Sequence, residues 1–284
     1  MKSVADREHP PPPRPPDIDL SLRSLVMKPG RFLTEAGDIT RYALRVIIEM
    51  PQVGAYLSEV LRQAGILILS SGLVIWTMMV SIGGMCGVES HYLLQQVGAP
   101  LYSGVFTSYC SMRECAPYVW GYILAAKVGC GIVAELGSMR ISDEVDAMEV
   151  MGVRSLPYLM CTRLLAAWMA MPFLYIVGIG LNYLTMYYIV VEQLGGVSRG
   201  GYLYVFWLFQ SPLDLVFSLS KSFAMGTVIV LVGCFYGYTA SGGPVGVGRN
   251  TSKSMMVNLI MIHVIGMVGT AMFWGFAPNA PIAN

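Results

Sequence analysis

The chain of 284 residues contains five long stretches that are almost free of charge, and they limit its fold more than any other feature. Residues 64–88 and 164–191 carry no charged side chain at all. A helix rises about 1.5 Å per residue, so about 20 apolar residues cross the hydrocarbon core of a bilayer. The other three stretches are residues 115–137, 213–239 and 254–276. We therefore predict an all-α integral membrane protein with about five transmembrane helices.

One more uncharged stretch, residues 93–112, has a different character. It contains Gln95, Gln96, Gly98 and Pro100 close together, which favours a loop over a membrane span. We expect this stretch to connect the first two spans at the outer surface. The count rises to six only if it inserts into the membrane.

Composition excludes several other classes of protein. Hydrophobic residues make up 55% of the chain and charged residues 12%, about half the share of an ordinary soluble domain. A single soluble domain could not keep that many apolar side chains from water, and the same percentages exclude a disordered or fibrous chain. The net charge of +1 gives no reason to expect a nucleic-acid partner. Six cysteines without a C-x-x-C pair, and only three histidines, predict neither a disulfide framework nor a metal site.

The N-terminal part of the chain differs from the rest. Residues 1–20 contain the run PPPPRPP and are expected to form a disordered, Pro-rich cytoplasmic tail without the apolar core of a signal peptide. Residues 21–63 interleave apolar residues with Arg and Lys, a pattern typical of amphipathic helices that lie in the membrane interface. A soluble helical cap is the alternative. Residues 64–284 then form the transmembrane domain.

The positive charges of the loops predict the orientation. With the N-terminus inside, 14 Lys and Arg residues lie inside and two, Arg113 and Arg199, lie outside. Because Lys and Arg concentrate in cytoplasmic loops, residues 139–163 and 240–253 are expected in the cytoplasm. The chain would be a multi-pass protein of the plasma (inner) membrane, with a cytoplasmic N-terminus and an extracytoplasmic C-terminus.

The first of these cytoplasmic loops contains a segment, residues 142–152, with the pattern of a short helix. Ser142 is a suitable N-cap, Asp143 and Glu144 fit the first turn, where the helix dipole favours acids, and Gly152 fits the position after the helix. At 100° per residue the side chains separate onto an acidic and an apolar face: Asp143, Asp146 and Glu149 on one, and Val145, Met148 and Met151 on the other. Such a helix is either a docking element or a solvated loop helix, and the pattern alone leaves both open.

The same segment resembles the signature of the MlaE/YrbE permease family, the membrane subunits of Mce-type lipid ABC transporters. The family pattern runs roughly E-E-x-D-A-L-x-x-M-G, followed by P-R-x-x-A. The sequence ISDEVDAMEVMGVRSLPYL matches it through Asp143-Glu144, Asp146-Ala147-Met148 and Met151-Gly152. It departs at Thr162, where many members have Pro before the Arg. Here the chain is similar to the B-type YrbE subunits of actinobacterial Mce operons.

Further stretches resemble the family in the same order along the chain, over about residues 40–277. Residues 112–117 (MRECAP) resemble R-E-x-G-P, with Ala in place of Gly. Val128-Gly129 and the AELG of residues 134–137 resemble V-G…A-E-L-G. Asp214 with the SKS of residues 220–222 resembles D…K-S, and residues 237–248 resemble the turn before the last helix.

The resemblance implies that the 142–152 helix is a coupling helix, which docks into a separate ATPase subunit. The residues expected to couple are Ser142, Asp143, Glu144, Asp146, Met148, Glu149, Met151 and Gly152. ATP and Mg²⁺ would bind the ATPase, and this chain would be a non-catalytic subunit without a cofactor. Its glycine-rich run, GPVGVGRN at residues 243–250, lacks the Lys of a P-loop. Residues 242–248 are expected to be a tight cytoplasmic turn.

Three ionisable residues at the edge of or within the spans are candidates for a lipid pocket: Arg113, Glu114 and Lys221. Charged groups are costly in a membrane and therefore point to function. In the family, the matching positions line the lipid pocket at the dimer interface. A mutually satisfied structural cluster is the alternative. We expect Lys127, deeper in the second span, to be structural.

The resemblance also implies a complex. Its expected members are a second permease subunit, which is a paralogue in a heterodimer, two ATPase subunits, and a ring of MCE proteins outside. The complex would move a phospholipid, a fatty or mycolic acid, or a sterol between the membrane and the MCE proteins. The lipid and the direction stay open.

Two other functions compete with this reading. An ion-coupled secondary carrier of a hydrophobic substrate would need membrane-embedded acids, for which Glu114, Glu135 and Asp214 are the candidates. An intramembrane lipid-modifying enzyme would need convergent His, Asp or Ser groups, and no recognisable motif supplies them. Binding to an ATPase separates the permease from both.

Overall fold

The computed structural model describes residues 29–275, in which every regular element is helical. These residues belong to two units, of which the first ends at Thr40 and the second runs from Arg41. The tail expected at residues 1–20, the beginning of the expected interfacial region and the C-terminal residues lie outside the described range. The fold below is that of the second unit.

Residues 29–275 contain five candidate membrane spans, as the sequence predicts. Each is a helix or a nearly unbroken series of helical segments long enough to cross a bilayer. Their bounds are α3 (Leu57–Gln96), the run Pro100–Ile141 (η2, α4, η3, α5, η4 and α6), the run Pro157–Gln193 (η5, α8 and η6), α10 (Pro212–Tyr238) and α11 (Gly243–Trp274). The protein is thus an all-α integral membrane protein.

The first span begins earlier than the sequence suggests. Residues 57–63 were expected in the interfacial region, but they form the first turns of α3. Glu59 and Arg62 explain the difference, because they pair at 2.7 Å on the helix surface and need no loop to reach water. Before α3, the chain forms α2 (Pro29–Glu49) and the short 3-10 helix η1 (Met50–Tyr56). The interfacial location of α2 stays a prediction.

Residues 93–112 were expected to form a loop, but most of them are helical. The loop is limited to Val97–Ala99, and Gly98 adopts a φ of +73° in it. Pro100 then starts the second span, because a proline fits the first helical position, where no backbone N–H donor is needed. The segment extends the second span and adds no sixth one.

The turn before the last span is also shorter than expected. Gly242 and Gly243 have φ values of +82° and +71° and make the turn, but α11 already begins at Gly243. Residues 244–248 are therefore helical. Gly246 permits this tight start, since a Cβ there would lie 1.8 Å from the carbonyl oxygen of Ser241.

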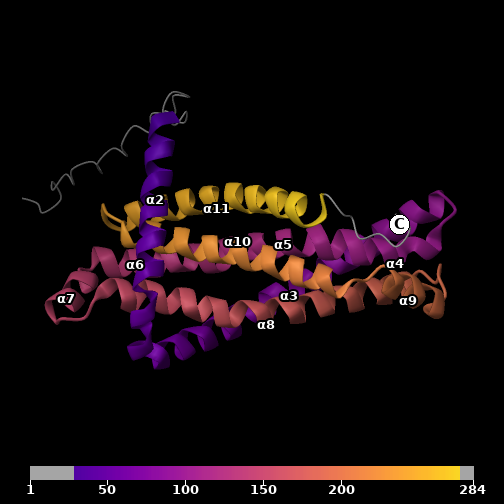
Figure 1. Ribbon diagram of the computed structural model, residues 1–284, viewed down its shortest axis with the longest axis horizontal. Helices are drawn as coiled ribbons and strands as arrows, with labels where there is room; N and C mark the ends of the chain where they lie inside the picture. The colour runs from indigo at the N-terminus through magenta and orange to yellow at the C-terminus, as the bar shows by residue number, and fades with distance from the viewer. Residues whose placement is uncertain (1–28, 276–284) are drawn as a thin grey trace, which may run out of the picture. The chain divides into compact units, whose positions relative to one another are not determined.

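The spans pack through small residues and a few buried polar bonds. The long helix α3 lies along α8 (Thr162–Tyr187), and α10 contacts α6 (Cys130–Ile141), α8 and α11 (Figure 1). Gly237 lets α10 approach α6, because a Cβ there would come within 2.7 Å of the Cβ of Leu136. Asn182 of α8 donates a hydrogen bond of 3.0 Å to the carbonyl of Met79 in α3.

Short helices mark the two ends of this bundle (Figure 1). At one end, here named the α7 end, α7 (Glu144–Val150) links the second and third spans. At the other, the α9 end, α9 (Arg199–Leu208) links the third and fourth. The hydroxyl of Tyr202 lies 2.7 Å from that of Thr107 and ties α9 to the second span. Burial raises the pKa of Tyr202 to about 12, so this phenol stays neutral at physiological pH.

Candidate functional site

A π-helical segment positions the first two residues of the candidate site. The segment is η3 (Thr107–Cys115), which interrupts the α-helical run of the second span and contains Arg113 and Glu114. Short π-helical segments occur often at functional sites, where they redirect side chains and carbonyl groups. Here two successive carbonyl oxygens accept bonds from α10: that of Met112 from the hydroxyl of Ser218 at 2.6 Å, and that of Arg113 from Lys221 at 3.0 Å.

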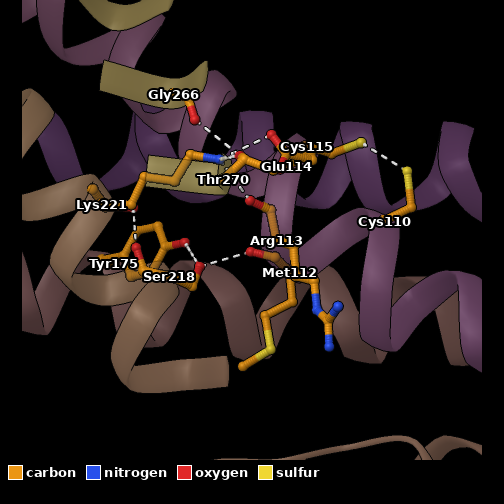
Figure 2. Close-up of polar contacts among 11 residues, drawn as sticks. Cys110, Met112, Arg113, Glu114, Cys115, Tyr175, Ser218, Lys221, Gly266 and Thr270 are labelled. Carbon is orange, nitrogen blue, oxygen red and sulfur yellow. Dashed lines mark hydrogen bonds and ion pairs between the residues drawn. The ribbon is translucent and has the colours of Figure 1, made fainter. Parts of the chain in front are cut away.

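Lys221 is the centre of the site. Its ammonium donates three hydrogen bonds: to the Arg113 carbonyl, to Glu114 Oε2 at 2.9 Å and to Thr270 Oγ1 at 2.7 Å (Figure 2). Thr270 Oγ1 also lies 2.5 Å from Glu114 Oε1 and 2.9 Å from the carbonyl oxygen of Gly266. All three N–H donors of the ammonium are therefore used, inside a side chain with an exposed fraction of 0%.

Arg113 points the other way and forms a second ion pair. Its guanidinium lies away from Lys221 (Figure 2) and bonds Asp214 Oδ2 at 2.7 Å. The other oxygen of Asp214 accepts a 2.7 Å bond from the indole N–H of Trp274. The guanidinium carbon also lies 3.9 Å from the ring centroid of Tyr109, within the range of a cation–π contact.

The two ion pairs together form the polar cluster, which consists of Arg113, Glu114, Asp214, Lys221 and Thr270. It holds two cations and two anions, so its net charge is zero. Side-chain exposure is 10% or less for Arg113, Asp214 and Lys221, but 36% for Glu114. The structure thus brings together all three residues predicted from the sequence, and the Glu114 carboxylate is the member most accessible from outside.

The sequence analysis did not identify the residues that α11 contributes to the polar cluster and its surroundings. Thr270 and Trp274 lie four residues apart and therefore share one helix face, which meets the cluster. Gly269 beside them admits the stem of Lys221, since a Cβ there would lie 3.3 Å from Lys221 Cγ. Thr, Trp and Gly are ordinary residues in a transmembrane helix, so no signal in the sequence distinguishes them.

The second candidate region is α7, and its start differs from the expectation. Ser142 does not cap this helix. It follows the end of α6, and its hydroxyl donates to the Ser138 carbonyl at 3.0 Å. Asp143 precedes α7 with a left-handed φ of 59°, and the helix begins at Glu144. The reason is that a serine hydroxyl can donate to the backbone carbonyl four residues earlier instead of capping the next helix. Gly152 has a φ of +81° and follows Met151, the residue that caps the end of the helix.

Two acids of α7 are used inside the loop. Asp146 pairs with Arg140 of α6, and Glu149 Oε1 accepts a 2.5 Å bond from the Ser155 hydroxyl. Val145 is 1% exposed and anchors the helix to the core. The acidic residues therefore hold the α7 loop in place as well as facing outward.

The outward surface of α7 contains apolar side chains that the helical pattern did not predict. Met148 packs against the core, but Met151 is 72% exposed, although it was expected on the same face. Val150 beside it is 88% exposed. The helix ends at Val150, so Met151 no longer follows the 100° periodicity on which the expectation rested. Val150 and Met151 are named here the α7 apolar tip.

The described residues contain no group of three or more His, Cys, Asp and Glu side chains arranged to hold a metal ion. The Sγ atoms of Cys110 and Cys115 lie 3.8 Å apart in η3 as free thiols (Figure 2).

Known proteins are similar to this chain over most of its length. A probable ABC transporter permease protein of Rickettsia prowazekii is 26% identical over 244 residues, which cover 86% of this chain and 94% of the relative. A probable ABC transporter permease protein of Synechocystis is 28% identical over 176 residues, or 59% of this chain and 63% of the relative. The chloroplastic protein TRIGALACTOSYLDIACYLGLYCEROL 1 of Arabidopsis thaliana is 28% identical over 166 residues, or 57% of this chain and 46% of the relative.

The family comparison agrees with these relatives. The family described as Permease MlaE matches residues 60–272, a range that begins in the first turns of α3, ends near the end of α11 and includes both the polar cluster and α7. A match over most of the chain, with five helices able to cross a membrane, identifies a multi-pass membrane permease subunit. The chain belongs to the MlaE permease family.

Proposed function

We propose that this chain is the membrane subunit of an Mce-type ABC lipid transporter and that a separate ATPase drives it through α7. The observation that carries the proposal is the α7 loop. A helix anchored by buried Val145 presents exposed Val150 and Met151 beyond the end of the bundle. Exposed apolar side chains on a well-anchored helix favour a protein partner, since they gain by leaving water. No ATP site is expected in this chain; ATP and Mg²⁺ would bind the ATPase.

The lipid substrate is supported by the polar cluster. A phospholipid needs a polar place for its headgroup beside apolar surface for its chains. Glu114 is the exposed member of the cluster, and Arg113 and Lys221 lie beside it. We propose that these three residues form the headgroup site: exposed Glu114 meets the headgroup, and the buried cations Arg113 and Lys221 lie behind it. The name of the Arabidopsis relative contains a galactolipid, which agrees with a lipid substrate.

The proposed complex has further members: a second permease subunit, a paralogue in a heterodimer, and an MCE ring at the α9 end, opposite the two ATPases. The α7 end would then be cytoplasmic.

The competing ion-coupled carrier finds less support, because each of its candidate acids is already paired with a cation. Glu114 pairs with Lys221, Asp214 with Arg113, and Glu135 with Arg163 at 2.6 Å.

The experiment is co-purification of an ATPase with the tagged chain after mild detergent extraction. The test variant is the double substitution Val150→Asp, Met151→Asp, which places charge on the α7 apolar tip without touching Asp146 or Glu149. The matched control is Val97→Asp, another exposed valine (69%) at the opposite end of the bundle.

We expect the native chain and the control to retain an ATPase and the double variant to lose about nine-tenths of it, since charge in an apolar contact costs more than 1.4 kcal/mol. Replacing the α7 acids by Lys is a weaker test, because Asp146 and Glu149 also form the bonds that hold the α7 loop in place. If the double variant retained as much ATPase as the native chain, α7 would not be the docking point. The absence of any ATPase from the native preparation would instead favour the ion-coupled carrier.

A further inference from the structure

A polar groove lies on the flank of the bundle, apart from the polar cluster. It runs between α3 and the segment from η4 (Ala125–Gly129) to α6, with the first turn of α8 at its base, and has a volume of about 210 Å³. Its walls combine apolar side chains with charged and hydroxyl groups. The polar lining residues are Gln63, Ser70, Ser71, Lys127, Glu135 and Arg163.

Lys127 is the unusual residue of this groove. Its side chain is exposed, and it makes no ion pair or hydrogen bond with another residue in the range that the structure describes. Glu135, the one acid that lines the groove, is paired with Arg163 at 2.6 Å. The groove therefore carries a net charge of +1. Lys127 was expected to be structural, but it has no partner among the described residues of this chain, unlike Lys221, so that expectation stays a prediction.

The groove reaches from the α7 end into the depth of the membrane. Gln63, Arg163 and Glu135 each lie six residues from the α7 end of their helical run, which corresponds to about 9 Å. Lys127 lies eight residues beyond Glu135, about 12 Å deeper. With 40 residues, α3 is about 60 Å long and extends past a bilayer of about 40–45 Å. If this excess length is shared equally between the two ends of α3, the mouth of the groove is level with the headgroups and Lys127 with the upper acyl chains.

An ammonium group at that depth needs an anion or water. A lysine in a membrane span stays stable by reaching toward the headgroups or by pairing with an opposite charge. The groove offers no free acid of its own, but it has an amide donor in Gln63 at its mouth and a hydroxyl in Ser70, seven residues deeper on α3. The Gln63 amide has two N–H groups, and one of them donates to Glu59 Oε1 at 2.8 Å. It also has space: a Cβ on Gly131, one turn from Lys127, would meet no atom within 4 Å.

We infer that this groove binds the anionic phosphate headgroup of a membrane lipid, with Lys127 as its counter-charge. Gln63, at the mouth, would donate to a phosphate oxygen, and the ammonium of Lys127 would reach toward the same phosphate from below. The acyl chains would leave along the apolar walls, which include Ile66, Leu67 and Ile132. This site lies in the half of the protein next to α7 and is separate from the polar cluster, so it does not depend on the proposed function.

The test is lipid retention measured by native mass spectrometry of the full chain, purified in mixed micelles of phosphatidylglycerol and phosphatidylcholine. Lys127→Gln is the main variant, and Lys127→Arg keeps the charge. Gly131→Leu fills the groove and leaves the charge in place. Lys253→Gln, on an exposed lysine at the α7 end of α11, is the matched control for lost charge.

We expect the native chain, Lys127→Arg and Lys253→Gln to retain one phosphatidylglycerol in preference to phosphatidylcholine. Lys127→Gln should weaken that retention about tenfold, which is about 1.4 kcal/mol, because it removes a charge-assisted bond. Gly131→Leu should weaken it to a similar extent, because its side chain fills the groove. Lys127 is exposed and unpaired, so its substitution leaves folding intact, which an unchanged Tm would verify.

Three results would overturn the inference. The first is equal phosphatidylglycerol retention by Lys127→Gln and the native chain. The second is displacement of the lipid by inorganic phosphate, which would assign the groove to a soluble anion. The third is a change of oligomeric state in Lys127→Gln without a change in retained lipid, which would mean that Lys127 pairs with a carboxylate of another chain.

Discussion

At the scale of single residues, Lys221 is the side chain on which the polar cluster depends. Its three donors are bound to a carbonyl, a carboxylate and a hydroxyl from two other spans. A buried ion pair is weak evidence for stability as a whole, but removing one partner leaves the other charge unpaired. The cluster therefore links the second, fourth and fifth spans in one particular arrangement.

Replacement of Lys221 by Met should destabilise the protein strongly, because it leaves the Glu114 carboxylate without its counter-charge. We expect the free energy of unfolding to fall by about 3 kcal/mol, measured by thermal denaturation in detergent. Ser220→Ala, on the exposed neighbouring residue, should leave the Tm unchanged. The double variant Lys221→Met, Glu114→Gln should recover part of the loss, since no unpaired charge remains. A double variant no more stable than Lys221→Met would contradict this account.

The sequence predicts three of the four charged residues of the polar cluster, but neither the part of Asp214 in it nor the uncharged residues around it. Arg113, Glu114 and Lys221 stand out because ionisable groups are rare in apolar stretches. Thr270 and Trp274 do not, because their role depends on which helix faces α11, and that depends on packing between spans distant in sequence. The pairing of Arg113 with Asp214 was likewise invisible before the helices were assembled.

At the scale of elements, α7 and η3 show where local sequence patterns are insufficient. The acids and Gly152 of residues 142–152 correctly indicate a short helix, but Ser142 belongs to the end of α6. The π-helical segment η3 has no recognisable pattern, because its bonding depends on the contacts of Met112 and Arg113 with α10. Apolar periodicity finds helices reliably and their ends poorly.

The glycine that ends α7 should be sensitive to substitution. Gly152→Ala introduces a Cβ that meets no atom within 4 Å, so its cost comes only from the left-handed φ of +81°. We expect a loss of about 1 kcal/mol in the free energy of unfolding. Gly180→Ala is the matched comparison. Its Cβ is equally free of contacts, but Gly180 lies inside α8 with an ordinary φ, so this change should be neutral or slightly stabilising. Equal Tm shifts for both variants would disprove the conformational explanation.

At the scale of the whole molecule, the five spans follow directly from the uncharged stretches, whereas their exact lengths do not. The first, second, third and fifth spans are longer than the stretches that predicted them. Ion pairs such as Glu59 with Arg62 let charged residues continue a helix past the apolar core. The span number therefore depends on composition, and the span ends depend on side-chain pairing and on the placement of Pro and Gly.

The orientation expected from the loop charges gives the last prediction. In a chain whose native cysteines are replaced, Lys253→Cys, ten residues after the first residue of α11, should be protected from a membrane-impermeant maleimide added to intact cells. Arg199→Cys at the start of α9 should be labelled. Both residues are exposed, so access depends on the side of the membrane. Labelling of Lys253→Cys with protection of Arg199→Cys would invert the proposed arrangement of ATPase and MCE proteins.

The neutrality of the polar cluster bears on how the cell's membrane potential can act on this protein. Moving one elementary charge through about 100 mV involves about 2.3 kcal/mol. The cluster contains Arg113 and Lys221 against Glu114 and Asp214. A rearrangement that carries the four groups together moves no net charge through the field. The electrical gradient would then neither drive nor oppose that step, and the only charge it could act on there would be the charge of the lipid itself.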